Sequence, residues 1–176
     1  MQILSLVRDP AHMEEGFRLL LQEYQQRLYW HIRRLVGQHE DANDILQNVL
    51  LKVYRNIHDF KGKAQLYTWL YRIATNETLT FLNKKKKKSA ISLEQEMTNL
   101  ANTLKADEYF DGSAAQFKLQ QAILGLPEKQ KLVFLMRYFE GLPYQEIAII
   151  LETSVGGLKA SYHHAVKKIE TFIKEK

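Results

Sequence analysis

Apolar residues recur every three or four positions along most of the chain, the spacing of helices that bury one face. Three such stretches fill residues 14–83. The first ends at Gly37, as a helix with a glycine C-cap would, and the second starts at or just before Asp41. The third follows a polar turn at 59–63 and begins near Leu66. This half of the chain therefore predicts a bundle of three to four helices.

A second helical region follows, with shorter helices. Leu126-Pro127-Glu128 indicates a helix start with proline in the first turn, and Gly141 ends that helix. A short helix begins near Pro143 and a longer one near Val155. Only 3 Pro and 8 Gly interrupt 176 residues, which favours helices over short strands. We expect an all-α fold with two small helical domains, residues 1–83 and 116–176.

The stretch between them, residues 84–115, lacks this periodicity. It opens with five consecutive lysines, Lys84 to Lys88, and then the charge reverses through Glu94, Glu96 and Asp107. Polar and small residues dominate the rest. The pattern predicts a flexible linker with one short helix around 93–100. The lysine run has two interpretations that the sequence leaves open, a solvated helix end and a phosphate contact.

Composition excludes several classes of function. The chain has no cysteine, so disulfides, thiolate catalysis and cysteine-based metal sites are ruled out. No phosphate-cradling glycine motif, nucleophile elbow or metal-ligand spacing is present, so we expect no enzyme activity, no metal and no cofactor. The apolar patch at 3–7 is too short for a signal sequence and no run is long enough to span a membrane, which predicts a cytoplasmic protein. The net charge of +5 is compatible with a polyanionic partner.

The stretch 142–169 has the pattern of a helix-turn-helix. Ser154 is the better candidate for the N-cap of the second helix, and Gly156 and Gly157 follow in its first turn. Glycines there weaken a helix, so their value would be a close approach of the backbone to a phosphate. Polar residues then occupy the face away from the apolar positions: Lys159, Ser161, His163, His164 and Lys167. This is the layout of a recognition helix in a major groove, although a plain helical hairpin with a solvated face has the same polarity.

One position departs from the helix-turn-helix pattern. The turn residue that is often glycine is Glu152, which would be strained in a left-handed conformation.

Aromatic and cationic residues alternate around the third helix of the first half: Phe60, Lys61, Lys63, Tyr67, Trp69, Tyr71 and Arg72. Such a mixture stacks unpaired bases and neutralises phosphates, with stacking contributing roughly 1–3 kcal/mol per base. Trp69 is in phase with Ile73, so a place in the core is the alternative reading for it and for one of the tyrosines.

Two sets of motifs together resemble the bacterial sigma factors. The stretches 41–49, 60–62 and 67–76 look like the second conserved region of that family, and 126–128, 141–148 and 154–159 look like the fourth. The domain that separates these regions in larger sigma factors is missing, as in the small extracytoplasmic-function (ECF) group. The resemblance implies RNA polymerase core and promoter DNA as partners. It leaves open whether an anti-sigma factor is a third.

The resemblance also assigns residues. It places the polymerase contact on Asp41, Asp44, Gln47, Asn48 and Lys52, with Asn48 where the family usually has glutamate. It places the minus-ten strand against Phe60, Lys61, Lys63, Gln65, Tyr67, Arg72 and Asn76. It places the minus-thirty-five element against Ser154, Gly156, Gly157, Lys159, Ser161, His163, His164 and Lys167. Ser161, His164 and Val166 depart from the arginines usual in the family.

Two other classes of function remain as alternatives. A one-component helix-turn-helix regulator would bind its operator without polymerase and carry a ligand pocket in the first half. A protein–protein adaptor would use the basic patches for acidic partners and ignore promoter sequence.

Overall fold

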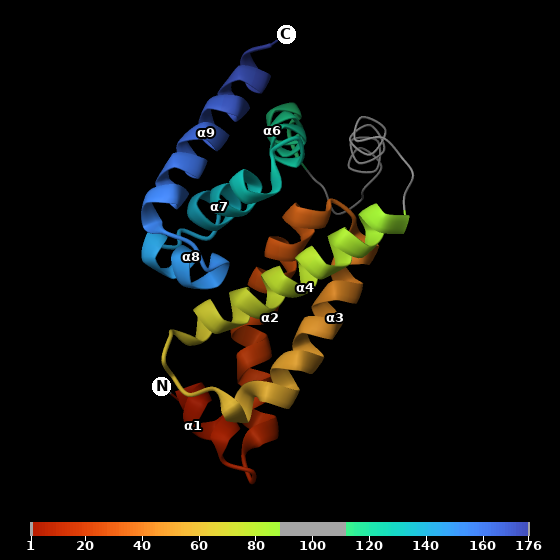
Figure 1. Ribbon diagram of the computed structural model, residues 1–176. Coiled ribbons are helices and arrows are strands. Elements are labelled where there is room, and N and C mark those ends of the chain that lie inside the picture. Colours follow the sequence, from red (N-terminus) through yellow and green to blue (C-terminus); the bar gives the residue numbers. More distant parts are fainter. Residues whose placement is uncertain (1, 89–111, 176) are drawn as a thin grey trace.

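The computed structural model describes residues 2–88 and 112–175, and its regular elements are all helical (Figure 1). The N-terminal domain holds α1 (Gln2–Arg8), α2 (Met13–Val36), α3 (His39–Asn56), the 3-10 turn η1 (Ile57–Asp59) and α4 (Leu66–Lys88). The C-terminal domain holds α6 (Ala114–Leu124), α7 (Glu128–Tyr138), α8 (Tyr144–Leu151) and α9 (Val155–Lys174). The expected all-α fold with two small domains is confirmed. The short helix expected around 93–100 lies outside the described residues.

Helices α2, α3 and α4 form the N-terminal bundle, and their apolar faces meet in one core. Fully buried members of this core include Leu28, Ile32, Val49, Val53 and Leu70. The predicted C-cap is confirmed, since Gly37 is left-handed at φ 77° and its N–H donates to the Arg33 carbonyl at 2.9 Å. The turn from α2 into α3 therefore follows from a local signal in the sequence.

Helix α1 is an element that the sequence pattern did not predict. It packs against the start of α2, where Val7 is 1% exposed. The contact depends on Gly16, because a Cβ atom there would lie 2.7 Å from the Val7 backbone nitrogen. A glycine inside a helix usually costs about 1 kcal/mol relative to alanine, and here it permits the close crossing. The apolar patch at 3–7 is thus a packing surface.

The linker boundary at Lys84 was predicted too early, because α4 continues through the lysine run to Lys88. Lysine is a good helix former, and cations are favoured at a helix C-terminus. Two of the lysines also find carboxylates: Lys85 Nζ lies 2.7 Å from Asp41 Oδ2 and Lys86 Nζ 3.8 Å from Glu128 Oε2. At the other boundary α6 begins at Ala114, two residues earlier than predicted, behind a Ser113 capping box.

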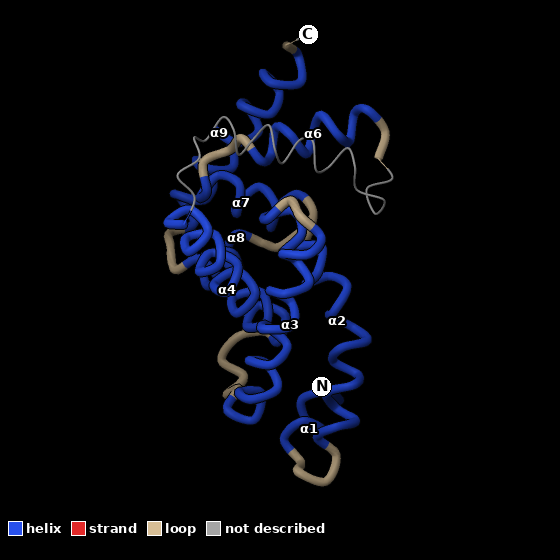
Figure 2. The backbone as a smooth tube through the Cα atoms, turned by 90° about the vertical axis from the view of Figure 1, so that its right-hand side faces the viewer, coloured by secondary structure: helices blue, strands red, loops and turns tan. Residues whose placement is uncertain are grey.

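The two domains pack against each other along α2 and α4 (Figure 2). Helix α8 lies on α4, while α7 and α6 contact α2. Apolar residues of both domains join in one buried cluster, which includes Tyr71 and Ala74 of α4 with Leu142, Ile147 and Ile150 of the C-terminal domain. Within the described ranges, no helix combines the length and the apolar character needed to cross a membrane.

Candidate polymerase and nucleic-acid interfaces

The outer face of α3 carries the residues assigned to polymerase contact. Asp44, Gln47, Asn48 and Lys52 are exposed, and Asp41 is half-buried. Two members of the set form ion pairs with α4, Asp41 with Lys85 and Lys52 with Glu77. The remaining three face solvent in a row along the helix.

The same face holds two apolar residues that the sequence reasoning missed. Leu51 is 54% exposed and Tyr54 41% exposed, and Tyr54 packs edge-on against Phe17 of α2. Both lie out of phase with the buried row that contains Val49 and Val53. That phase difference is a signal that would have identified them. Exposed large apolar side chains beside polar ones are typical of a protein–protein interface.

The loop between η1 and α4 is a polar turn anchored by a buried ring. Lys61, Lys63 and Gln65 are exposed, as a strand-binding loop requires. Phe60, by contrast, is 6% exposed and packs on Trp69 with ring centroids 5.3 Å apart. The expectation that the Phe60 ring offers a stacking surface is therefore wrong for this conformation, because the ring belongs to the core.

Helix α1 holds the same loop in place through one hydrogen bond. Arg8 Nη2 donates to the Phe60 carbonyl at 2.7 Å, and Gly62 makes the turn at φ 71°.

Helix α4 follows the loop and divides its polar residues between solvent and the C-terminal domain. Asn76 is exposed and Tyr67 is half-buried. Tyr71 is fully buried and donates from its hydroxyl to Glu140 Oε2 at 2.5 Å, so it is not a stacking surface here. Arg72 is exposed and forms an ion pair with Glu152 of the C-terminal domain.

Helix α9 begins as the sequence predicted. The Ser154 hydroxyl accepts a hydrogen bond from the Gly157 N–H at 3.2 Å, which confirms the N-cap. A Cβ atom at Gly156 would meet nothing within 4 Å, so the start of the helix is open on that side. Such a helix start, with backbone N–H groups facing outward, can receive a phosphate.

The outer face of α9 presents a row of basic side chains to solvent. Lys159, His163 and Lys167 follow one another at every fourth position, and His164 is exposed beside them. Lys168, which sequence reasoning did not single out, extends this surface, while Ser161 is half-buried. The whole arrangement suits binding to an anionic groove and offers no chemistry for catalysis.

The turn before α9 is left-handed at Glu152, with φ 51°. The strain anticipated for this position is therefore present in the structure. Glu152 is the only non-glycine residue with positive φ in the described ranges.

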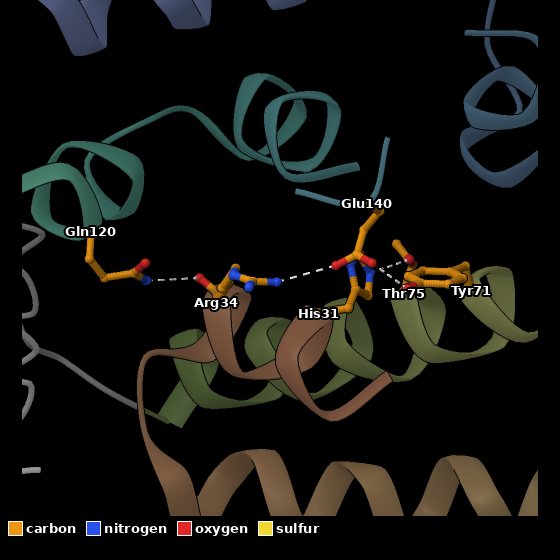
Figure 3. Close-up of polar contacts among 6 residues, drawn as sticks. All are labelled: His31, Arg34, Tyr71, Thr75, Gln120 and Glu140. Atoms are coloured by element: carbon orange, nitrogen blue, oxygen red, sulfur yellow. Dashed lines mark hydrogen bonds and ion pairs between the residues drawn. The ribbon is translucent and has the colours of Figure 1, made fainter. Parts of the chain in front are cut away.

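A partly buried polar network joins the domains and was not predicted (Figure 3). The Glu140 carboxylate accepts from Arg34 Nη1 at 3.2 Å and from the Tyr71 hydroxyl. Gln120 Nε2 donates to the Arg34 carbonyl at 3.4 Å. Burial, reinforced by the Glu140 hydrogen bond, raises the pKa of Tyr71. Burial lowers the pKa of Arg34, and the adjacent Glu140 carboxylate opposes that shift.

His31 lies beneath this network and is fully buried. Its Nε2 lies 3.0 Å from the Thr75 hydroxyl, and its ring packs edge-on against Tyr71. The Nδ1 atom has no hydrogen-bond partner. Burial lowers the pKa of His31 to about 3. In residues 2–88 and 112–175, no group of three or more His, Asp or Glu side chains could hold a metal ion.

The two domains correspond to two known families. Residues 20–88 match the family described as "Sigma-70 region 2", and residues 116–169 match "Sigma-70, region 4". These matches span α2 to α4 and α6 to most of α9. The second match confirms that α8 and α9 form the expected helix-turn-helix.

Relatives match over most of the chain. The ECF RNA polymerase sigma factor SigW of Bacillus subtilis is 31% identical, over 85% of this chain and 84% of the relative. The RNA polymerase sigma-H factor of Pseudomonas aeruginosa is 30% identical, over 89% of this chain and 86% of the relative. The ECF RNA polymerase sigma-E factor of Haemophilus influenzae is 28% identical, over 91% and 88%.

Solved structures share the fold. The sigma factor RpoE, crystallised with the anti-sigma factor NepR from Bartonella quintana, superposes with a TM-score of 0.73 at 18% identity, covering 92% of this chain and 99% of that one. CnrH, solved with the cytosolic domain of CnrY, gives 0.71 at 15% identity, covering 97% and 94%. With both conserved regions present and relatives matched along most of its length, this chain belongs to the ECF family of RNA polymerase sigma factors, non-enzymatic proteins that direct the polymerase to promoters.

Proposed function

We propose that this sigma factor divides promoter recognition among three surfaces. The outer face of α3 docks on the polymerase core, the 60–65 loop with α4 holds the unpaired minus-ten strand, and α9 reads the minus-thirty-five element. The observation that supports this division is exposure. The candidate polar residues that face solvent lie on three separate faces of the molecule, each with its own chemistry.

The docking surface combines polar and apolar contacts. Asp44, Gln47 and Asn48 are exposed while the buried side of α3 is complete without them. Leu51 and Tyr54 add apolar area that a partner would cover. An interface of this kind gains affinity from the apolar residues and orientation from the polar ones.

The strand-binding surface consists of the Lys61, Lys63 and Gln65 side chains, with Arg72 and Asn76 on the following helix. Cationic and amide groups along one track can follow a sugar–phosphate backbone. Tyr67, half-buried at the edge of this surface, is the aromatic ring that we assign to an unstacked base.

The reading surface is the exposed row on α9 with the open helix start before it. Backbone N–H groups near Ser154 receive a phosphate, and Lys159 reaches either the adjoining backbone or a guanine edge. Histidines carry less positive charge at neutral pH than the arginines usual in the family. Binding at this element therefore depends strongly on the polymerase holding the other domain, through effective concentration.

An anti-sigma factor is the regulatory partner that we propose. Two proteins of the same fold were solved in complex with an anti-sigma factor or with the cytosolic domain of CnrY. The place of action that we propose is the cytoplasm, where polymerase and promoter DNA are found.

One experiment tests the assignment of the docking surface. Purified chain is added to sigma-free polymerase core, and promoter-directed transcription and core binding are measured. Asp44→Lys/Gln47→Ala should reduce core binding at least tenfold and leave the helical circular dichroism intact. A matched pair on the exposed side of α2, Glu15→Lys/Gln25→Ala, should bind as the wild type. Equal core binding by both variants would contradict the docking assignment.

A second experiment tests the strand-binding loop. Lys61→Ala/Lys63→Ala/Gln65→Ala should slow open-complex formation on duplex promoters. A pre-melted bubble should rescue part of the defect, because the base pairs are already broken. Normal permanganate reactivity of promoter thymines with this variant would refute the assignment.

A further inference from the structure

We infer that the lysine end of α4, residues Lys84 to Lys88, is a further DNA-binding surface, which holds phosphates of the duplex upstream of the minus-ten element. The inference rests on the proposed contact of α4 with the minus-ten strand and extends it to double-stranded DNA. It gives a partner to a motif for which the proposed function has no role.

The five lysines belong to a folded helix, and all five are exposed. Two of them lie near carboxylates: Lys85 pairs with Asp41 of α3, and Lys86 Nζ lies 3.8 Å from Glu128 Oε2, beyond hydrogen-bond distance. In residues 2–88 and 112–175, no carboxylate forms an ion pair with the other three lysines of the run. The last turn of α4 therefore carries an excess of positive charge that the described residues do not neutralise.

Helix stability alone does not explain the run. A cation in the last turn is stabilised by the helix dipole. Like charges three or four residues apart repel each other, however, and Lys84 has both Lys87 and Lys88 at these spacings. Each lysine added to the same turn therefore offsets part of what the dipole contributes. An anionic partner across this turn removes the repulsion, and the phosphates of a duplex are such a partner.

The lysine end continues a polar track along α4. Successive residues of an α-helix lie about 100° apart around its axis, so Arg72, Asn76, Asn83 and Lys87 fall within an arc of about 60°. All four side chains are exposed. Lys85, whose ion pair reaches α3, lies on the opposite side of the helix. The residues that we assign to the minus-ten strand and the free lysine at the helix end thus share one face of α4.

The length of α4 sets where a duplex meets the lysines. Fifteen residues separate Arg72 from Lys87, which is about 22 Å along the helix axis. The same length of duplex holds about six to seven base pairs. Because the 60–65 loop at the start of α4 is assigned to the unpaired strand, the duplex that leads to the minus-thirty-five element follows α4 toward its other end. The lysines then meet phosphates about six to seven base pairs upstream of the strand that Arg72 contacts.

Lysine suits a contact of this kind. Its ammonium group is a point charge on a flexible stem, and it binds a phosphate without the fixed geometry of arginine. Such a contact adds affinity at every promoter and carries no sequence preference. The lysine end lies at the opposite end of α4 from the turns on which α8 packs, so it is open to a partner in the free chain (Figure 1).

The first experiment measures how promoter binding by the holoenzyme depends on salt. The test variant is Lys84→Ala/Lys87→Ala/Lys88→Ala, which removes charge and keeps a good helix former at each position. The charge-retaining control places arginine at the same three positions. Lys174→Ala, at the exposed end of α9, is the control for a distant positive charge. The probe is a fluorescein-labelled promoter duplex that the wild-type holoenzyme transcribes, and core binding of each variant is measured separately.

The test variant should weaken promoter binding about tenfold and reduce the salt slope by about 2 to 3, nearly 1 for each phosphate contact. Both controls should match the wild type. An unchanged salt slope in the test variant would overturn the inference. A loss of core affinity with an unchanged slope would do the same, because it would assign the lysines to the polymerase.

The second experiment locates the contact with neutral phosphates. Methylphosphonate linkages replace three successive phosphates at a time along the duplex upstream of the minus-ten element. The wild-type holoenzyme should lose affinity when these linkages lie about six to seven base pairs upstream of the melted strand. The test variant should be insensitive to the same replacement, since the matching charge on the protein is already gone. Equal losses for wild type and test variant at every position would contradict the inference.

Failure of the underlying assignment is separately visible. If holoenzyme with Arg72→Ala/Asn76→Ala forms open complexes at the wild-type rate, α4 does not hold the melted strand, and the proposed function fails there. The neutral linkages still decide the inference in that case, because they compare the lysines with duplex phosphates directly.

Discussion

Helices α4 and α9 both carry residues assigned to promoter DNA, but α4 is packed against the other domain and the outer face of α9 is not. On α9 the basic row that includes Lys159 and Lys167 faces solvent. On α4 the assigned residues Arg72 and Asn76 are also exposed, but Arg72 is held by a carboxylate of the other domain, and its neighbours Thr68 and Tyr71 are buried against that domain. From residue types alone, the two surfaces would be expected to be equally accessible to DNA. What separates them is the packing of α8 on α4.

The comparison implies that the two surfaces respond to different changes. The α4 side should be sensitive to mutations that weaken the contact between domains, because its groups are buried and partnered. The α9 side should be sensitive to the loss of its positive charges, to salt concentration and to the loss of the N-cap in its first turn. Four predictions, from the largest expected effect to the smallest, test this difference.

The largest effect is expected from Glu140→Ala. It leaves the partly buried Arg34 and the buried Tyr71 hydroxyl without their shared acceptor, and leaving such donors unpaired costs about 3 kcal/mol. Urea unfolding of the full chain should show this loss. Glu140→Gln, which keeps an acceptor oxygen, should lose less. A loss below about 1 kcal/mol for the alanine variant would mean that the covered surface is held by apolar contacts alone.

The second effect is a pH dependence that belongs to the covered side. His31 has a pKa of about 3 in the folded chain, below the 6.5 of an ordinary histidine, so the unfolded chain binds more protons between these values. The stability that neutral His31 provides is complete above pH 6.5 and should fall by about 1.4 kcal/mol per pH unit as the pH drops toward 3.

Denaturant unfolding at pH 7 and pH 5 checks this. His31→Gln, which cannot take up the proton, should remove about 2 kcal/mol of the difference in unfolding free energy between the two pH values. The same slope in wild type and variant would show that His31 does not control the effect.

The third effect belongs to the open side. Lys159→Ala/Lys167→Ala should weaken holoenzyme binding to all promoters and reduce the salt slope by about 2 if both lysines bind phosphate. A loss of roughly 1–3 kcal/mol confined to one promoter position would instead assign a guanine contact to Lys159. Unchanged footprints would exclude this face as the reader.

The smallest effect is expected at the start of α9. Ser154→Ala removes the side-chain acceptor for the Gly157 N–H, and the loss of such a cap costs about 1 kcal/mol. Thermal unfolding measures the loss, and Ser154→Asp, which keeps a capping oxygen, is the matched control. Equal stability of the alanine variant and the wild type would show that the cap contributes nothing measurable.

The features that could be predicted from sequence are those with a local cause. The Gly37 C-cap and the Ser154 N-cap each depend on a few neighbouring residues, and each is found where the pattern placed it. The division into two helical domains follows from periodicity, which a single sequence carries in full.

The features that were missed or wrong depend on contacts between distant residues. Phe60 and Tyr71 were taken as part of a stacking surface because aromatic and basic residues alternate there, but their rings are buried by partners far along the chain. Helix α1 was missed because its packing on α2 depends on the close approach that Gly16 allows, which only the fold shows. The early linker boundary at Lys84 ignored carboxylates that only the fold brings near.

One contact described earlier has a practical consequence. Arg8 holds the Phe60 carbonyl, so the loop that begins at Phe60 is fastened to a helix that precedes residue 20, where the match to the conserved region begins. A fragment trimmed to that match would keep every residue of the loop but would lose the Arg8 hydrogen bond that holds it. A bulky purification tag placed next to α1 would strain the same point. Kinetic studies of promoter melting are therefore best done with α1 retained and an affinity tag at the far end of the chain.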